Sequence, residues 1–139
     1  KMPILQHQNT VLYTDFLYAA NNATQHFKNS GYMNNGIESE IAKVQKRLPR
    51  WFMNTNQYNS KILYAFLKLY NQETGYVLYD DLQKTANLGD QFKSNFDQMK
   101  NFGENNHGKI FEQVGNCVYL WEETKEIVLK YWHEVRKNV

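Results

Sequence analysis

The segment that decides the fold is YVLYDDLQKTANLGDQFKSNFDQMK, residues 76–100. Residues 76–79 are aromatic or apolar and too few for a helix, so they predict a brief strand. Asp80 is predicted to cap a short helix that ends at about residue 87. Leu88 and Gly89 form a turn, and Asp90 is predicted to cap a further helix over about 90–101. Two short helices therefore follow the strand, separated by a glycine turn.

After residue 103 the apolar residues change from a helical spacing to alternation. Residues 109–114 and 117–121 alternate around a Gly-Asn pair, and glycine in the first of two central positions suits a tight hairpin turn. In that register Phe111 faces Leu120, and Gln113 faces Val118. A two-stranded hairpin is therefore predicted.

Helical patterns lie on both sides of this region. Apolar stripes predict helices over about 10–28, 36–48, 60–70 and 122–137. Pro49 is expected to end the second of them, because proline disfavours helical geometry in the residue before it. The amide-rich and aromatic stretch 50–59 is predicted to be a packed connection.

From residue 60 the predicted order is helix, strand, helix, turn, helix, hairpin, helix. This order resembles the winged helix-turn-helix family over residues 60–139. The sequence therefore predicts a mainly α fold with a small β-hairpin, a winged helix-turn-helix preceded by an N-terminal helical extension. The expected domains are an N-terminal helical region, 1–58, and a winged domain, 59–139. The resemblance implies that the helix at 90–101 reads DNA and that the hairpin at 109–121 is the wing.

The predicted reading helix would present polar side chains outward. Asn and Gln can pair with adenine edges in the major groove, and Lys can reach guanine or a phosphate. The same residue types are also common on any exposed helix. The candidate DNA-binding residues of this helix are Gln91, Lys93, Ser94, Asn95, Gln98 and Lys100.

Two further segments are candidates for contact with the sugar-phosphate backbone. The loop before the hairpin offers His107 and Lys109, and we expect the contact from Lys109 more than from His107. A basic cluster precedes Trp51 and Phe52 and could bind phosphates. Such a run of cations is more often the solvent-exposed end of a helix. The cluster consists of Lys43, Lys46, Arg47 and Arg50.

The net charge of the chain is only weak evidence for nucleic-acid binding. The whole sequence carries a formal charge of +2. From residue 60 onward it has ten Lys or Arg against eleven Asp or Glu, so the excess of positive charge lies in the N-terminal part. This is the strongest sequence argument against DNA binding by the winged segment alone.

Patterns typical of enzymes and metal sites are missing from the sequence. The single cysteine, Cys117, excludes an internal disulfide, and the four histidines show no paired spacing for zinc. There is no glycine-rich phosphate loop. We therefore expect no catalytic activity, no cofactor and no metal. No apolar run approaches the roughly 20 residues of a membrane span, and a cytoplasmic location is expected.

Two functions remain open. The first is a double-stranded DNA-binding protein, such as a regulator of transcription or an accessory protein of replication, transfer or restriction. It could act as a homodimer through its N-terminal helix, because symmetric readers engage two half-sites. The second is a protein-interaction module on a winged scaffold. Its interface would use Tyr119, Trp121 or the apolar stripe from Leu12 to Phe27.

Overall fold

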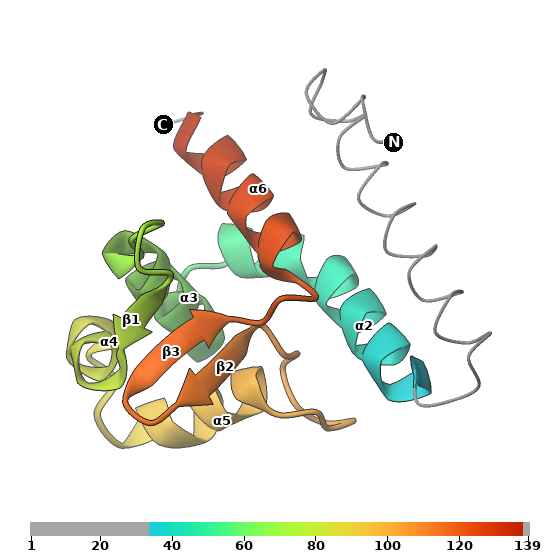
Figure 1. Ribbon diagram of the computed structural model, residues 1–139, viewed down its shortest axis with the longest axis horizontal. Helices are drawn as coiled ribbons and strands as arrows, with labels where there is room; N and C mark the ends of the chain where they lie inside the picture. The colour runs from blue at the N-terminus through green and yellow to red at the C-terminus, as the bar shows by residue number, and fades with distance from the viewer. Residues whose placement is uncertain (1–33, 138–139) are drawn as a thin grey trace. The chain divides into compact units, whose positions relative to one another are not determined.

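The computed structural model describes residues 34–137, and its elements are labelled as in Figure 1. The chain divides into two compact units, Lys1–Ser39 and Glu40–Val139, and the following description concerns the second unit and the helix that leads into it. In chain order the elements are α2 (Asn34–Met53), α3 (Tyr58–Leu69), β1 (Tyr76–Leu78), α4 (Tyr79–Ala86), the 3₁₀ turn η2 (Gly89–Gln91), α5 (Phe92–Lys100), β2 (Phe111–Val114), β3 (Cys117–Leu120) and α6 (Lys125–Lys137).

The three strands form one antiparallel sheet in the order β1-β3-β2. The predicted hairpin register is confirmed, since Phe111 pairs with Leu120 and Gln113 pairs with Val118. Gly115 has φ +60° at the turn, a conformation that glycine adopts without steric cost. The predicted brief strand is β1, which pairs with β3 and makes the sheet three-stranded.

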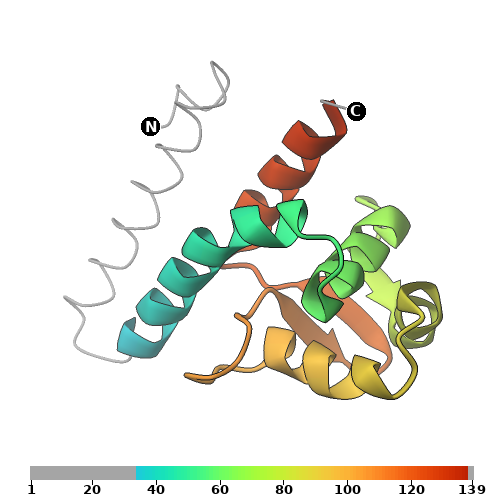
Figure 2. The same cartoon turned by 180° about the vertical axis from the view of Figure 1, so that it is seen from behind.

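Helices α3 and α5 cover one face of this sheet, as the two opposite views show (Figures 1 and 2). The ring of Phe111 on β2 lies 4.9 Å from that of Phe66 on α3 and 5.4 Å from that of Phe96 on α5, between centroids. All three side chains are fully buried. The core of the domain therefore lies between α3, α5 and the sheet, and it holds α5 at a fixed angle to the hairpin.

Helix α2 differs from its prediction, because it continues past Pro49 to Met53. A proline inside a helix costs about 3 kcal/mol through a lost hydrogen bond and a steric clash. The last turn of α2 buries Trp51 and Phe52, and burying a large apolar side chain contributes up to roughly 3 kcal/mol. Two such side chains outweigh the proline, so the predicted end at residue 48 is wrong.

The end of α2 packs against α6 through aromatic rings. Phe52 stacks on Tyr131 and Trp132 with centroids 6.1 Å and 6.5 Å away, and Tyr64 of α3 meets Trp132 edge-on at 5.7 Å. The second half of α2 therefore belongs to the same compact unit as the sheet, although the sequence placed it in a separate N-terminal region ending at residue 58.

Three helix starts also differ in detail from the sequence predictions. Helix α4 begins at Tyr79 with Leu78 in the N-cap position, and α5 follows a 3₁₀ turn that contains Asp90. Asp80 and Asp90 are therefore not N-caps, and in this described region neither helix has a side-chain cap. Helix α6 begins at Lys125 rather than at about 122, because a turn through the buried Thr124 precedes it.

At the level of fold class, the protein is mainly helical, as expected, and the expected hairpin is part of a small three-stranded antiparallel sheet. The helix predicted over 10–28, with its apolar stripe and proposed dimer contact, lies outside the described residues. The other proposed protein interface is largely occupied within the domain. Trp121 is buried and meets Phe102 edge-on, and the half-buried Tyr119 meets Tyr76 in the same way.

Candidate functional site

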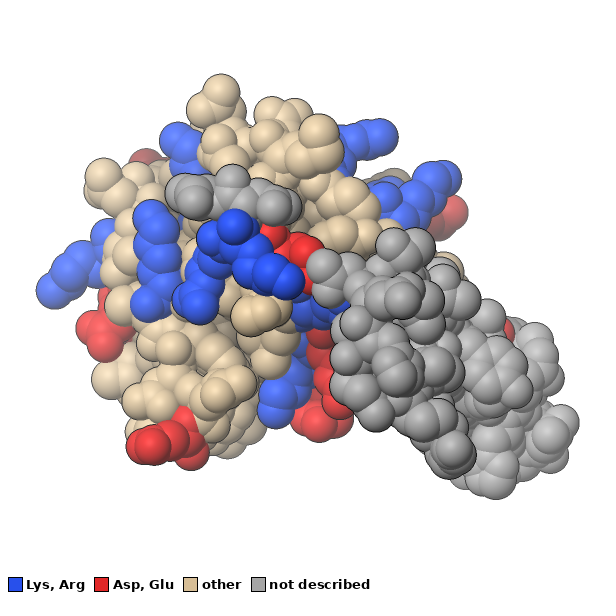
Figure 3. Space-filling view, turned by 90° about the horizontal axis from the view of Figure 1, so that it is seen from above, with Lys and Arg blue, Asp and Glu red and all other residues tan. Residues whose placement is uncertain are grey.

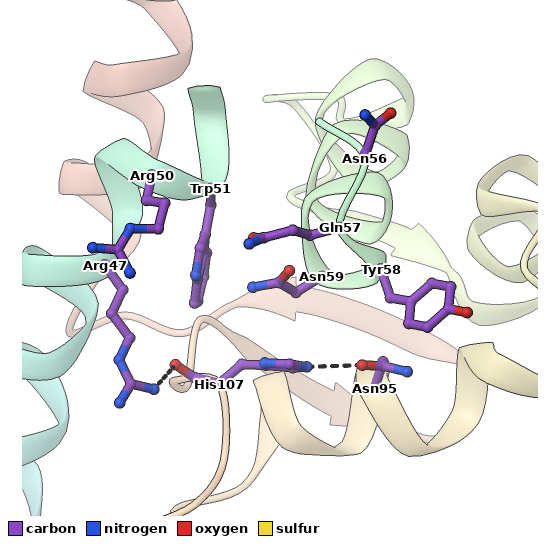
Figure 4. A pocket seen from close by; sticks show the side chains of 9 residues that line it. All are labelled: Arg47, Arg50, Trp51, Asn56, Gln57, Tyr58, Asn59, Asn95 and His107. Carbon is purple, nitrogen blue, oxygen red and sulfur yellow. Dashed lines mark hydrogen bonds between the residues drawn. The ribbon is translucent and has the colours of Figure 1, made fainter. Parts of the chain in front are cut away.

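A pocket with a volume of about 480 Å³ lies where α2, α3, α5 and the loop before β2 meet (Figure 4). It brings together four of the predicted DNA-binding residues from three separate segments: Arg47 and Arg50 of α2, Asn95 of α5, and His107 of the loop. The other lining residues are Trp51, Asn56, Gln57, Tyr58 and Asn59.

The basic cluster of α2 holds the loop before β2. The Arg47 guanidinium donates hydrogen bonds from Nη1 to the carbonyl oxygens of Asn106 at 3.0 Å and His107 at 2.9 Å. The Lys43 ammonium donates to the carbonyl of Gly103 at 2.6 Å and lies 3.5 Å from the Glu40 carboxylate. These two cations therefore connect α2 to the loop, and only part of the Arg47 guanidinium is left for a ligand.

His107 and Asn95 connect the same loop to α5. The Asn95 amide nitrogen donates to the carbonyl of Gln91 at 2.7 Å, so its Oδ1 is the acceptor for His107 Nε2 at 2.8 Å (Figure 4). In neutral His107 the proton is therefore on Nε2, and Nδ1 is a hydrogen-bond acceptor. Asn95 was expected to face outward but is only 8% exposed, because the loop covers it.

Burial, and then the positive charge of Arg47, lower the pKa of His107 below its usual 6.5. The unfolded chain therefore binds a proton on this imidazole at a higher pH than the folded chain does. Where the unfolded state binds more protons, stability decreases as the pH falls. As the pH falls from about 6.5 to the lower pKa that His107 has in the folded chain, the free energy of unfolding should decrease. Below that pKa, His107 should cause no further decrease.

We expect His107→Gln to show a weaker loss of stability than the wild type between pH 7 and pH 5. Glutamine can still donate a hydrogen bond to Asn95, but it does not titrate. Urea unfolding at a series of pH values measures the difference. The other three histidines are present in both proteins and serve as an internal control. Equal pH dependence in the two proteins would show that the imidazole of His107 titrates normally.

The remaining predicted residues of α5 divide into two groups. Gln91, Lys93 and Ser94 are exposed, whereas Gln98 and Lys100 are half-buried. Lys93 forms an ion pair with Asp97 at 3.0 Å, and Lys100 donates to the Gln113 side chain on β2 at 2.9 Å. The exposed surface of α5 is thus polar.

Lys109 is only 7% exposed, so the loop does not present it to solvent as expected. Its ammonium donates to the carbonyl of Lys100 at 2.6 Å and to that of Phe111 at 2.9 Å, and it lies 5.4 Å from the centroid of the Trp121 ring. Burial lowers the pKa of Lys109, although the nearby Glu112 carboxylate raises it. In this structure the side chain connects α5 to β2.

Two members of the basic cluster remain available at the surface. Lys46 and Arg50 are exposed, and their side chains form no ion pair with any residue in the described range. Lys and Arg side chains also gather in the middle of the face seen in Figure 3. The last turn of α6 carries two further exposed cations, Arg136 and Lys137.

Sequence reasoning did not identify the amide wall of the pocket. Gln57 and Asn59, at the start of α3, lie within the stretch that was expected to be a packed connection. Four amide side chains between residues 54 and 59, a few residues after the basic cluster, were the available signal. The loop before β2 and α5 complete the pocket but are far away in the sequence. The amide residues alone therefore could not show that a pocket forms there.

Comparisons with known protein families, curated proteins and solved structures found no match. Within residues 34–137 no helix is long and apolar enough to cross a membrane. The same part of the chain contains no group of three or more His, Cys, Asp or Glu residues placed to hold a metal ion. The candidate site therefore depends on the cations and amides around the pocket.

Proposed function

We propose that this chain is a non-enzymatic, double-stranded DNA-binding protein of the winged helix-turn-helix type. Helix α5 would enter the major groove, and the β2–β3 hairpin would be the wing. The observation that carries the proposal is the position of Arg47 and Arg50 at a pocket shared with α5. A reader helix with cations beside it can be positioned on a duplex by contacts to the phosphates.

The order of the elements supports the winged-helix assignment. From α3 to β3 the chain follows helix, strand, helix, helix, strand, strand, and the first strand pairs with the last. Both short helices are anchored in the core by buried residues, among them Leu82 on α4 and Phe92 on α5. The exposed residues Gln91, Lys93 and Ser94 then remain on the surface of α5 for contact with DNA.

The position of α2 weakens the charge argument against DNA binding. The segment from residue 60 has no positive excess, but α2 adds Lys46, Arg47 and Arg50 to the same compact unit. Each phosphate contact releases counterions and makes the affinity more dependent on salt. A small number of such contacts fits a protein with a modest net charge, acting as a regulator of transcription or as an accessory of replication, transfer or restriction.

We expect Arg50→Ala to weaken binding to a random-sequence duplex about three- to tenfold at low salt and to reduce the salt slope by about one phosphate contact. Fluorescence anisotropy at several salt concentrations measures both quantities. Arg50 is the residue of choice because its exposed side chain forms no described ion pair, so the variant should fold normally.

Lys137→Ala is the matched control, because it removes one exposed charge from the end of α6. It should change the affinity by less than a factor of about two, as expected for a charge outside the contact surface. A larger loss from Lys137→Ala than from Arg50→Ala would move the contact surface to α6. Absence of duplex binding at low salt would contradict DNA binding altogether.

A further inference from the structure

We propose that the pocket between α2, α3 and α5 binds a single nucleotide, with its phosphate on the arginine side and its base on the amide side. The nucleotide could be free in solution or unstacked from a DNA strand, and both sources offer the same chemistry. The inference does not depend on the proposed duplex binding, because a free nucleotide needs only the pocket.

The pocket has room for more than a single phosphate. Pockets for small organic ligands commonly measure roughly 300–1,000 Å³. The volume of about 480 Å³ lies within that range and leaves room for a ring system in addition to an anionic group. The lining residues are also distributed as such a ligand requires, with the two arginines on one side of the Trp51 ring and the amides of Gln57 and Asn59 on the other (Figure 4).

The arginine side suits a phosphate. Arg50 is exposed, and its side chain forms no ion pair with any described residue. Arg47 binds two carbonyls through Nη1, and its other donors have no acceptor within residues 34–137. Guanidinium groups form strong hydrogen bonds with phosphate oxygens.

The amide side contains a buried donor without an acceptor. Asn59 is only 5% exposed, and its Oδ1 accepts a hydrogen bond from the backbone N–H of Ser60 at 3.0 Å. Its Nδ2 has no acceptor among residues 34–137 and points toward Trp51 (Figure 4). A buried donor without an acceptor is destabilising, so a ligand that accepts a hydrogen bond from it gains affinity.

A nucleobase has the complementary groups. Its edge carries ring nitrogens and carbonyl oxygens that accept, next to amino or imino groups that donate. Asn59 Nδ2 and the Gln57 amide can donate to such an edge, and Nδ1 of neutral His107 can accept from it. The amides of Asn and Gln are also the side chains that most often pair with adenine, so an adenine nucleotide is the first ligand to test.

The first experiment titrates the full chain by calorimetry with dAMP, deoxyadenosine and inorganic phosphate. dAMP should bind at least about tenfold more tightly than either of its parts, because only it makes the charged and the amide contacts together. Phosphate that binds as tightly as dAMP would overturn the base assignment. The other three nucleoside monophosphates then rank the preference for the base.

Two variants separate the halves of the pocket. Asn59→Asp keeps the acceptor for Ser60 N–H but removes the free donor, and it should weaken dAMP binding about tenfold or more. Asn54→Asp introduces the same charge at an exposed residue outside the pocket and should have little effect.

Arg50→Gln should abolish the tighter binding of dAMP relative to deoxyadenosine, whereas Lys68→Gln should preserve it. Equal effects of the Asp variants at 59 and 54 would overturn the proposal.

A second experiment distinguishes the source of the nucleotide. A duplex with a terminal 2-aminopurine becomes more fluorescent when that base leaves the stack. If free dAMP does not bind, an increase of fluorescence with the wild type, lost in Asn59→Asp, assigns the pocket to an unstacked DNA nucleotide. Absence of both signals overturns the inference, even if anisotropy shows ordinary duplex binding; the two proposals can therefore fail separately.

Discussion

A chain that begins at Asn59 is expected to unfold without a cooperative transition, whereas a chain that begins at Asn34 should keep one. The shorter chain contains all of the segment that resembles a winged domain, but it lacks α2. Circular dichroism during thermal and urea unfolding measures the difference between the two chains.

The reason is the share of the core that α2 supplies. Val44, Leu48, Trp51 and Phe52 are buried in the compact unit formed with the sheet. Burial of four such side chains contributes roughly 6–12 kcal/mol, and the net stability of a domain is only about 5–15 kcal/mol. Removal of α2 therefore takes away an amount comparable with the whole stability.

Loss of α2 also leaves polar groups of the loop without partners. The Glu40 carboxylate is buried and accepts a hydrogen bond from the backbone N–H of Lys109 at 2.8 Å. The carbonyls that Lys43 and Arg47 bind would lose their donors as well. A cooperative transition in the chain from Asn59 would contradict this prediction and support a domain boundary at residue 58.

Lys109→Met is expected to destabilise the protein by about 2–4 kcal/mol, the largest effect among the single substitutions considered for this domain. Methionine retains most of the apolar stem but cannot donate to the carbonyls of Lys100 and Phe111, which are otherwise bound at 2.6 Å and 2.9 Å. A buried carbonyl left without a donor costs about 1–3 kcal/mol.

Lys93→Met is the control for the lost charge, because Lys93 lies exposed on α5 with only its ion pair to Asp97. It should change the free energy of unfolding by no more than about 0.5 kcal/mol. Urea unfolding at pH 7 compares both variants with the wild type. If the two variants were equally stable, the hydrogen bonds from the Lys109 ammonium to the two carbonyls would make no net contribution to the free energy of unfolding.

Local patterns were sufficient to predict the elements that depend on their own sequence. Alternation around Gly115 predicted the hairpin and its register, because a tight turn determines which residues face each other. The apolar residues of α5, Phe92, Phe96 and Met99, recur at the spacing of a helical turn, and all three are fully buried.

Features that depend on distant partners could not be predicted. Helix α2 passes Pro49 because Trp51 and Phe52 find a core contributed by other elements. Lys109 is buried because carbonyls from α5 and β2 converge on its ammonium. The pocket likewise needs Asn59 and His107 together, 48 residues apart in the sequence. No local spacing contains that information.

The position of Arg47 gives the pocket a connection to the surface that would meet DNA. This guanidinium now holds the carbonyls of Asn106 and His107, and His107 in turn contacts Asn95 of α5. A phosphate in the pocket would bind the same guanidinium that holds the loop beside α5. Thermodynamic linkage makes such coupling reciprocal: if an occupied pocket changes the affinity for a duplex, the duplex changes the affinity for the pocket's ligand by the same factor.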